Sequence, residues 1–147
     1  MFKQIVVGTD GSETAARAVG QALELAKTLD ARVEIVSAYA PVSPSRLRDE
    51  AKAVPAELQW RLNAREEVDT TLAAAVAQAR DAGVTVATHA REGDPADAIL
   101  DVAEEQGADL IVVGNKGMTG AKRFLLGSVP NKVSHHAPCS VLIIRTV

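Results

Sequence analysis

Short apolar runs alternate with longer stretches of helical character along almost the whole chain, and this alternation constrains the fold more than any other feature. A brief apolar run that ends in turn residues predicts a buried strand, and apolar residues that recur every three or four positions predict a helix. Strand and helix in alternation indicate a parallel sheet that is covered by helices on both faces. The expected strands are residues 4–9, 32–38, 84–90, 110–113 and 140–145, and the expected helices are roughly residues 10–28, 56–82, 94–107 and 129–136.

The order of the strands follows from the handedness of the connections between them. Right-handed crossovers leave few topologies, and the expected fold is α/β: a single doubly wound five-stranded parallel sheet of order 3-2-1-4-5 with helices on both faces. Residues 1–147 are expected to form one domain. The switch point of this sheet lies between the first and fourth strands. Ligands in such sheets bind at the carboxyl ends of the strands beside that point.

The composition is that of an ordinary soluble globular protein, and it argues against several classes of function. Apolar residues make up 47% of the 147 residues, charged residues make up 24%, and the formal net charge is −3. Neither disorder nor a basic nucleic-acid-binding surface is therefore expected. A single cysteine, Cys139, rules out an internal disulfide and fits a reducing compartment. The sequence has no signal-peptide pattern and no apolar stretch of membrane-spanning length, so the expected location is the cytoplasm and no membrane partner is expected.

A glycine-rich stretch, residues 114–117 (Gly-Asn-Lys-Gly), directly follows the apolar run 110–113. After nine further residues, the pair 127–128 (Gly-Ser) precedes the last expected helix. Glycine lets the backbone approach an anion closely, and the amide groups at the start of a helix carry partial positive charge. Ser128 is expected to be the N-cap of that helix and to offer its hydroxyl to a phosphate. The pattern therefore predicts an anion-binding loop at the carboxyl end of the fourth strand.

Asp10 follows the first expected strand, which places it at the same edge of the sheet as that loop. A carboxylate there can accept a ribose hydroxyl or help to hold Mg²⁺ beside phosphates. Its alternative role is the N-cap of the following helix, because Asp10 and Glu13 have the spacing of a capping box. Lys116, Lys122 and Arg123 can neutralise phosphate charge, although a solvent-exposed loop carries such residues in any case.

Other nucleotide and metal motifs are absent from the sequence. The Walker pattern is missing, and so is the dinucleotide pattern Gly-x-Gly-x-x-Gly after the first strand. His135 and His136 are adjacent on a helix and point about 100° apart, so they are not expected to chelate a metal ion. His89 lies within a strand and Cys139 precedes the last strand, and both are expected to be structural. No triad or pair of carboxylates indicates a catalytic site.

The paired motifs resemble those of the universal stress protein family, in its ATP-binding branch. The family pattern Gly-x2-Gly-x9-Gly-Ser/Thr is met by residues 114–128 without insertion, and residues 6–12 are similar to the first strand and turn of the family. The resemblance implies an adenine nucleotide alpha hydrolase-like fold, with Asp10 beside the ribose, the phosphates and nucleotide-bound magnesium. The residues implied to contact adenosine are Gly8, Thr9 and Ala38, and those assigned to the phosphate loop are Gly114, Asn115, Lys116, Gly117, Gly127, Ser128 and Val129.

The resemblance has two further implications, for assembly and for the ligand. Members of the family commonly form homodimers by pairing their last strands, here Ser140 to Arg145, and an exposed apolar edge strand does invite such pairing. Some ATP-binding members carry a second hydroxyl residue two positions after the Ser/Thr, where this chain has Pro130. Proline offers no donor, which leaves room for a ligand with less phosphate, such as AMP or a cyclic nucleotide.

The expected function is that of an ATP-binding regulatory protein of stress adaptation, with Mg²⁺ accompanying the nucleotide and with hydrolysis slow at most. One alternative is an enzyme, a slow ATPase or an adenylyl-transfer catalyst, that uses residues 40–55 as a lid over the same crevice. Another alternative is a partner-binding dimer whose nucleotide site is vestigial. The sequence leaves these alternatives open.

Overall fold

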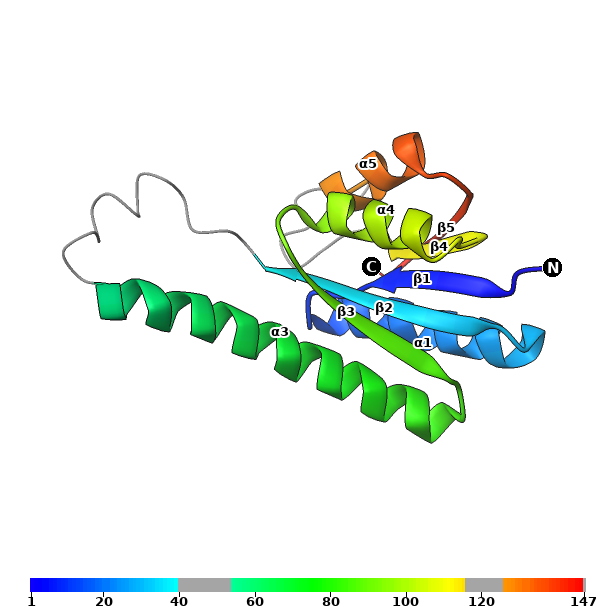
Figure 1. The fold of residues 1–147 in the computed structure, drawn as a ribbon. Helices are drawn as coiled ribbons and strands as arrows, with labels where there is room; N and C mark the ends of the chain where they lie inside the picture. Colours follow the sequence, from blue (N-terminus) through cyan, green and yellow to red (C-terminus); the bar gives the residue numbers. More distant parts are fainter. Residues whose placement is uncertain (40–53, 116–125, 147) are drawn as a thin grey trace.

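The sheet has five strands in the order β3-β2-β1-β4-β5 in the computed structural model of the chain (Figure 1). The structure describes residues 1–39, 54–115 and 126–146, and within helix α3 it describes side chains from residue 65 onward. All neighbouring strands run parallel, which confirms the expected order. The strands are β1 Gln4–Gly8, β2 Arg32–Tyr39, β3 Val86–Glu92, β4 Leu110–Gly114 and β5 Ser140–Ile144, and the helices are α1 Glu13–Leu29, α3 Val54–Ala82, α4 Pro95–Glu105 and α5 Ser128–His136.

The helices form one layer on each face of the sheet (Figure 1), and the alternation of side chains along the strands explains why. In β1, Ile5 and Val7 are fully buried among residues of α1 and α3. Val6, between them, is fully buried on the other face among residues of α4 and α5. The helix after β1 and the helix after β4 thus cover opposite faces, which places the switch point between these two strands.

The ends of the elements lie within a few residues of those expected wherever the structure describes them. β3 begins at Val86 rather than at residue 84, and α5 begins at Ser128 rather than at residue 129. Asp94 caps α4 by accepting a hydrogen bond from the Asp97 N–H, and Pro95 is the first helical residue. The connection and lid expected at residues 40–55 lie mostly outside the described residues, since only the last two of them belong to α3.

Candidate functional site

The two turns singled out in the sequence leave the sheet at the same edge. β1 and β4 are parallel neighbours, and Val7 of β1 is the register partner of Val112 of β4. Both strands end shortly after this pair, at Gly8 and Gly114. The turn after each strand therefore starts at the carboxyl edge beside the switch point, where doubly wound sheets bind their ligands (Figure 1).

The turn after β1 is fixed by hydrogen bonds within the protein. The Thr9 N–H donates to the carbonyl oxygen of Val36 on β2 at 2.9 Å, and the Gly11 N–H donates to Thr9 Oγ1 at 3.2 Å. Asp10 Oδ1 accepts a hydrogen bond from the Ser12 N–H at 2.9 Å. The Asp10 side chain is exposed, and its second carboxylate oxygen has no hydrogen-bond partner among the described residues. One acceptor of Asp10 thus shapes the turn and the other is open to a ligand.

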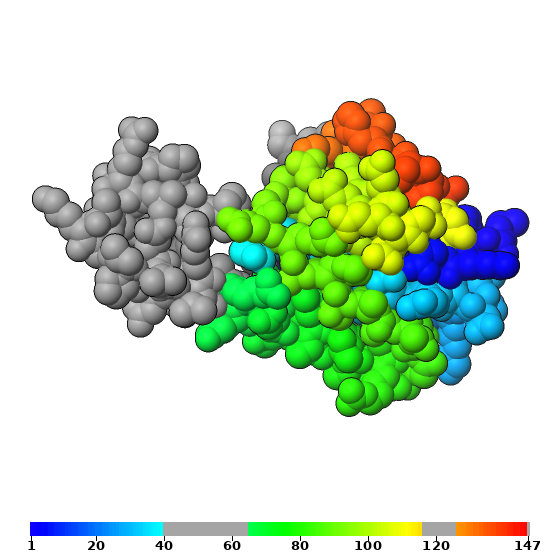
Figure 2. All heavy atoms as spheres, in the orientation of Figure 1, coloured from blue at the N-terminus to red at the C-terminus, as the bar shows by residue number. Residues whose placement is uncertain are grey.

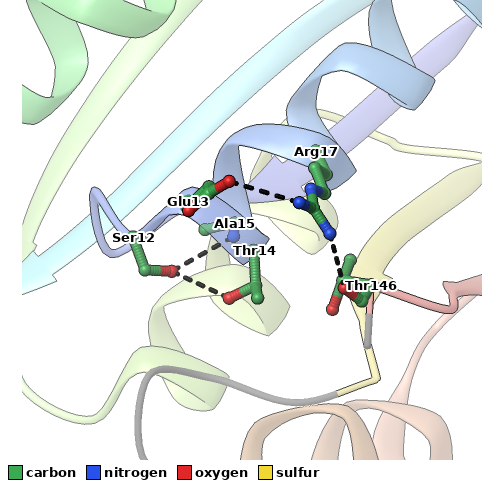
Figure 3. Close-up of polar contacts among 6 residues, drawn as sticks. All are labelled: Ser12, Glu13, Thr14, Ala15, Arg17 and Thr146. Atoms are coloured by element: carbon green, nitrogen blue, oxygen red, sulfur yellow. Dashed lines mark hydrogen bonds and ion pairs between the residues drawn. The ribbon is translucent and has the colours of Figure 1, made fainter.

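Ser12, rather than Asp10, is the N-cap of α1, so the expected capping box of Asp10 and Glu13 is wrong. Ser12 Oγ accepts a hydrogen bond from the Ala15 N–H at 3.1 Å and shares another with Thr14 Oγ1 (Figure 3). The physical reason lies in Gly11, whose φ of 82° bends the chain between Asp10 and the helix. A side chain at this position would be strained, because only glycine adopts this conformation readily.

The turn after β4 closes on itself at the start of α5. The Gly127 N–H donates to the carbonyl oxygen of Asn115 at 2.9 Å, which joins the two ends of the loop. Gly127 is the N-cap of α5 and provides no side-chain hydrogen bond, and Ser128 is the first helical residue. The expectation that Ser128 is the N-cap is therefore wrong, because the glycine before it already has the extended backbone that an N-cap requires.

Two backbone N–H groups at the start of α5 have no hydrogen-bond partner among the described residues: those of Ser128 and Val129. Pro130 has no N–H, and the Asn131 N–H makes the first bond of the helix, to the carbonyl oxygen of Gly127 at 3.0 Å. Unbonded N–H groups at a helix start carry the positive end of the helix dipole. This position therefore suits an anion, with the exposed Ser128 hydroxyl as a further donor.

None of the positive charges predicted near the phosphates lies in the described part of the chain. Lys116 and Gly117 lie outside the described residues, as do Lys122 and Arg123. Lys132 of α5 is turned toward the start of α4, where its Nζ lies 2.8 Å from Asp97 and 3.4 Å from Asp94. The hydrogen bond with Asp97 is the main cause that raises the pKa of Lys132. These contacts join the start of α4 (yellow-green) to the middle of α5 (orange), and the two helices form one continuous surface in Figure 2.

Gly8 and Ala38 lie on neighbouring strands near the same edge. Gly8 is the register partner of Val36 in β2, two residues before Ala38. A Cβ atom at Gly8 would lie only 2.4 Å from Cδ1 of Ile99, a residue of α4 that is 3% exposed. The glycine expected to approach a nucleotide thus already has a packing reason, because the side chain of Ile99 occupies the space that a Cβ atom at position 8 would need.

Other candidate sites receive less support from the structure. Among the residues it describes, no three His, Cys, Asp or Glu side chains gather as a metal site would require. His135 Nδ1 lies 2.7 Å from the carbonyl oxygen of Asn131, one turn earlier in α5. His89 lies 2.8 Å from the buried carboxylate of Glu34, in keeping with the structural role expected of it. In the described part of the chain, no helix is both long and apolar enough to cross a membrane.

The sequence analysis missed residues that connect the two turns. Thr146 is 3% exposed and bonds to Asn115 through both its N–H and its hydroxyl. Arg17 of α1 donates to the carbonyl oxygen of Thr146 (Figure 3). No local pattern marks these contacts, since they join residues 31 and 129 positions apart. The one sequence feature that could have pointed to them is Asn115, a polar residue directly after the glycine that ends β4.

The arrangement of strands and turns defines a class of protein: a doubly wound α/β protein, a fold in which ligands bind beside the switch point at the carboxyl edge of the sheet. The family model of the universal stress protein family matches residues 1–145 of this chain. A universal stress protein of Methanocaldococcus jannaschii is 38% identical over 99% of the chain and 83% of its own length. The chain therefore belongs to the universal stress protein family.

Solved structures of related proteins agree with the fold. A universal stress protein in complex with cAMP is 33% identical, with a TM-score of 0.73 over 99% of this chain and 98% of that one. A universal stress protein from Archaeoglobus fulgidus in complex with dAMP is 28% identical, with a TM-score of 0.69 and coverage of 98% of each chain. Both ligands are adenine nucleotides with a single phosphate group.

Proposed function

We propose that this protein binds an adenine nucleotide, ATP in the first instance, between the turn after β1 and the start of α5, and that the bound nucleotide serves as a signal in stress adaptation in the cytoplasm. The observation that carries the proposal is that the N–H groups of Ser128 and Val129 have no partner among the residues that the structure describes, at the edge of the sheet beside the Asp10 turn. The two related structures with bound cAMP and dAMP support the class of ligand.

Each part of the site has a distinct role in this proposal. The N–H groups of Ser128 and Val129 and the Ser128 hydroxyl donate to phosphate oxygens, with the dipole of α5 adding to the attraction. The Asp10 oxygen that has no partner within the described ranges accepts a ribose hydroxyl or contacts Mg²⁺ that accompanies the phosphates. The main chain around Gly8, Thr9 and Ala38, at the ends of β1 and β2, contacts the adenosine.

Pro130 bears on which nucleotide is preferred. It occupies the third position of α5, where another residue would supply a further N–H to the phosphates. With two amides in place of three, the gain from a second and third phosphate group is reduced. Titration of the protein with ATP, AMP and cAMP, with and without Mg²⁺, ranks these ligands, and the absence of heat at millimolar concentrations of all three would contradict the proposal.

Replacing Ser128 with proline is expected to weaken ATP binding by about 10- to 100-fold, and replacing it with alanine by less, because the proline removes an N–H as well as the hydroxyl. Proline suits the first position of a helix, and Gly127, with φ −63° and ψ 164°, has a backbone conformation that tolerates a following proline. Isothermal titration of the wild type, Ser128→Ala and Ser128→Pro measures separately the affinity lost with the hydroxyl and the affinity lost with the N–H.

The alanine variant is the matched control, because it lacks the hydroxyl but keeps the N–H. Thermal unfolding of both variants checks that α5 is intact. Equal ATP affinities for the alanine and proline variants, both folded, would show that the Ser128 N–H does not hold a phosphate.

We also propose that two copies of the chain pair through the region of β5, residues 140–145. β5 is an edge of the sheet, and its Leu142 and Ile143 are 39% and 37% exposed, which is unusual for large apolar side chains in a strand. Replacing Ile143 with lysine is expected to convert the dimer to a monomer, because a charge would be buried in the interface. Sedimentation velocity measures the change.

Thr88→Lys is the matched control for the interface, since it adds the same charge at an exposed position of the other edge strand, β3. The Thr88→Lys protein should sediment like the wild type. An Ile143→Lys protein that remains a dimer would place the interface elsewhere.

A further inference from the structure

Asn115 is the point at which three segments of the chain meet. Its N–H donates to the carbonyl oxygen of Ile144 at 2.8 Å, which ties it to the end of β5. Its carbonyl oxygen accepts the bond from Gly127 that closes the loop before α5. Its side-chain Oδ1 accepts two bonds from Thr146, from the N–H at 2.8 Å and from the hydroxyl at 3.0 Å. The N–H, the carbonyl oxygen and Oδ1 of Asn115 are thus all hydrogen-bonded within the protein.

Thr146 extends this connection to the other turn. Its carbonyl oxygen accepts a hydrogen bond of 3.1 Å from Nη1 of Arg17, in the first turns of α1 (Figure 3). Arg17 is also held by Glu13, 3.2 Å away. A continuous path of hydrogen bonds therefore runs from α1, directly after the Asp10 turn, through Thr146 and Asn115 to Gly127 at the start of α5.

We propose that Thr146 is a positioning residue for the nucleotide site: it fixes the two turns relative to each other through Asn115 and Arg17. This inference rests on the proposed nucleotide-binding function. The C-terminal segment after β5 then contributes to nucleotide affinity without touching the ligand, and its position depends on β5, the edge strand of the sheet.

The expected effect follows from the geometry that phosphate binding needs. The N–H groups of Ser128 and Val129 belong to α5, whereas Asp10 belongs to the turn before α1, so one ligand can meet both only at a fixed separation. Hydrogen bonds weaken steeply once their distances and angles depart from the preferred range. Because Thr146 is buried, breaking the bonds from its N–H and hydroxyl to Asn115 raises the free energy of the protein. These bonds therefore favour one arrangement of the two turns.

The test measures the ATP affinity of Thr146→Val and Arg17→Met by isothermal titration, with Mg²⁺ present and at a temperature at which every variant is folded. Valine keeps the shape of the buried threonine but removes its hydroxyl donor. Each variant is expected to bind ATP about 3- to 30-fold more weakly than the wild type. Thr146→Ser, which keeps the hydroxyl, is expected to stay within about twofold of the wild type, well inside such a coupling.

Two matched controls separate positioning from general effects. Thr28→Val removes a threonine hydroxyl at the far end of α1, whose one hydrogen bond within the described part of the chain is to the carbonyl oxygen of Glu24. Lys27→Met removes one positive charge from the last turn of α1, as Arg17→Met does from the first turns. Both controls are expected to bind ATP like the wild type.

A second readout distinguishes positioning from mere stability. Because coupling between two sites is reciprocal, bound ATP should slow hydrogen exchange at the amide of Thr146 in the wild type, although Thr146 is not expected to contact the ligand. The slowing should be lost in Arg17→Met at saturating ATP.

The outcomes separate this inference from the function on which it rests. A wild type that binds no nucleotide would overturn the proposed function and this inference together. A wild type that binds ATP, with Thr146→Val and Arg17→Met binding equally well, would overturn the inference alone. Weaker binding that Thr146→Ser shares, without ATP-dependent protection at Thr146, would also overturn it, because the residue would then act only through stability.

Discussion

Replacing His89 with leucine is expected to lower the free energy of unfolding by about 3 kcal/mol at neutral pH. The variant loses one of the two hydrogen-bond partners that the buried Glu34 side chain has among the described residues. The Glu34 side chain is 4% exposed, and its Oε2 lies 2.8 Å from His89 Nε2. Its other oxygen accepts a bond from Gln4 Nε2 at 2.7 Å, which remains in the variant. Chemical denaturation of wild type and variant measures the difference.

A second substitution tests this reason. Replacing both Glu34 and His89 with leucine removes the buried charge together with its partner, so the double variant is expected to be more stable than His89→Leu alone. Arg91→Leu is the matched control on the same strand, because it breaks a pair with Glu105 whose side chains are 35% and 48% exposed. Such a partly exposed pair contributes little to stability. A cost for His89→Leu no larger than that for Arg91→Leu would contradict the prediction.

The strand order and the general position of the site could be predicted because they depend on local patterns. The apolar run of residues 110–113 and the opening strand are short and free of polar interruption, as strands covered on both faces must be. Asp94-Pro95 marks the start of α4 unambiguously, since aspartate suits the N-cap and proline suits only the first helical position. Once the elements alternate, the rule of right-handed crossovers fixes which turns meet.

The exact residues at which the helices of the site begin were harder to predict, because neighbouring residues are both suited to be the N-cap. Asp10 and Ser12 are both good N-caps by type, and only the left-handed backbone of Gly11 decides between them. At α5, Gly127 and Ser128 compete in the same way, and the glycine is the cap. Residue preferences cannot resolve a shift of one or two positions, although such a shift decides which N–H groups remain free.

Contacts between residues far apart in the chain could not be predicted from the sequence. Glu34 and His89 are 55 residues apart, and each lies in a strand whose pattern looks unremarkable alone. The two bonds between Thr146 and Asn115 depend on how the chain turns after β5, which no periodicity describes. Such contacts arise from register and packing between elements, so they become visible only when the strands are paired.

Gly8 shows how a motif residue can have a structural cause, and its replacement by valine is expected to destabilise the protein by about 3 kcal/mol or more. Its Cβ position lies 2.4 Å from Cδ1 and 3.0 Å from Cγ1 of Ile99, so α4 or its side chain must move. Ile99 is 3% exposed and has little space into which to turn. Thermal and chemical unfolding measure the loss, and Gly8→Ala should show a smaller one of about 1–3 kcal/mol.

A double-mutant cycle with Ile99→Ala identifies the cause. Alone, Ile99→Ala leaves a cavity and is expected to cost about 2–5 kcal/mol, but it also removes both atoms that crowd Gly8. The Gly8→Ala and Ile99→Ala changes together should therefore cost less than the sum of the two, by about 1 kcal/mol or more. Gly20→Ala is the control, because its Cβ would meet only the flexible end of Gln78, at 3.2 Å, and helix propensity favours alanine there. Additive costs in the cycle would mean that α4 does not exclude a side chain from position 8, and the glycine would then be explained by the ligand instead.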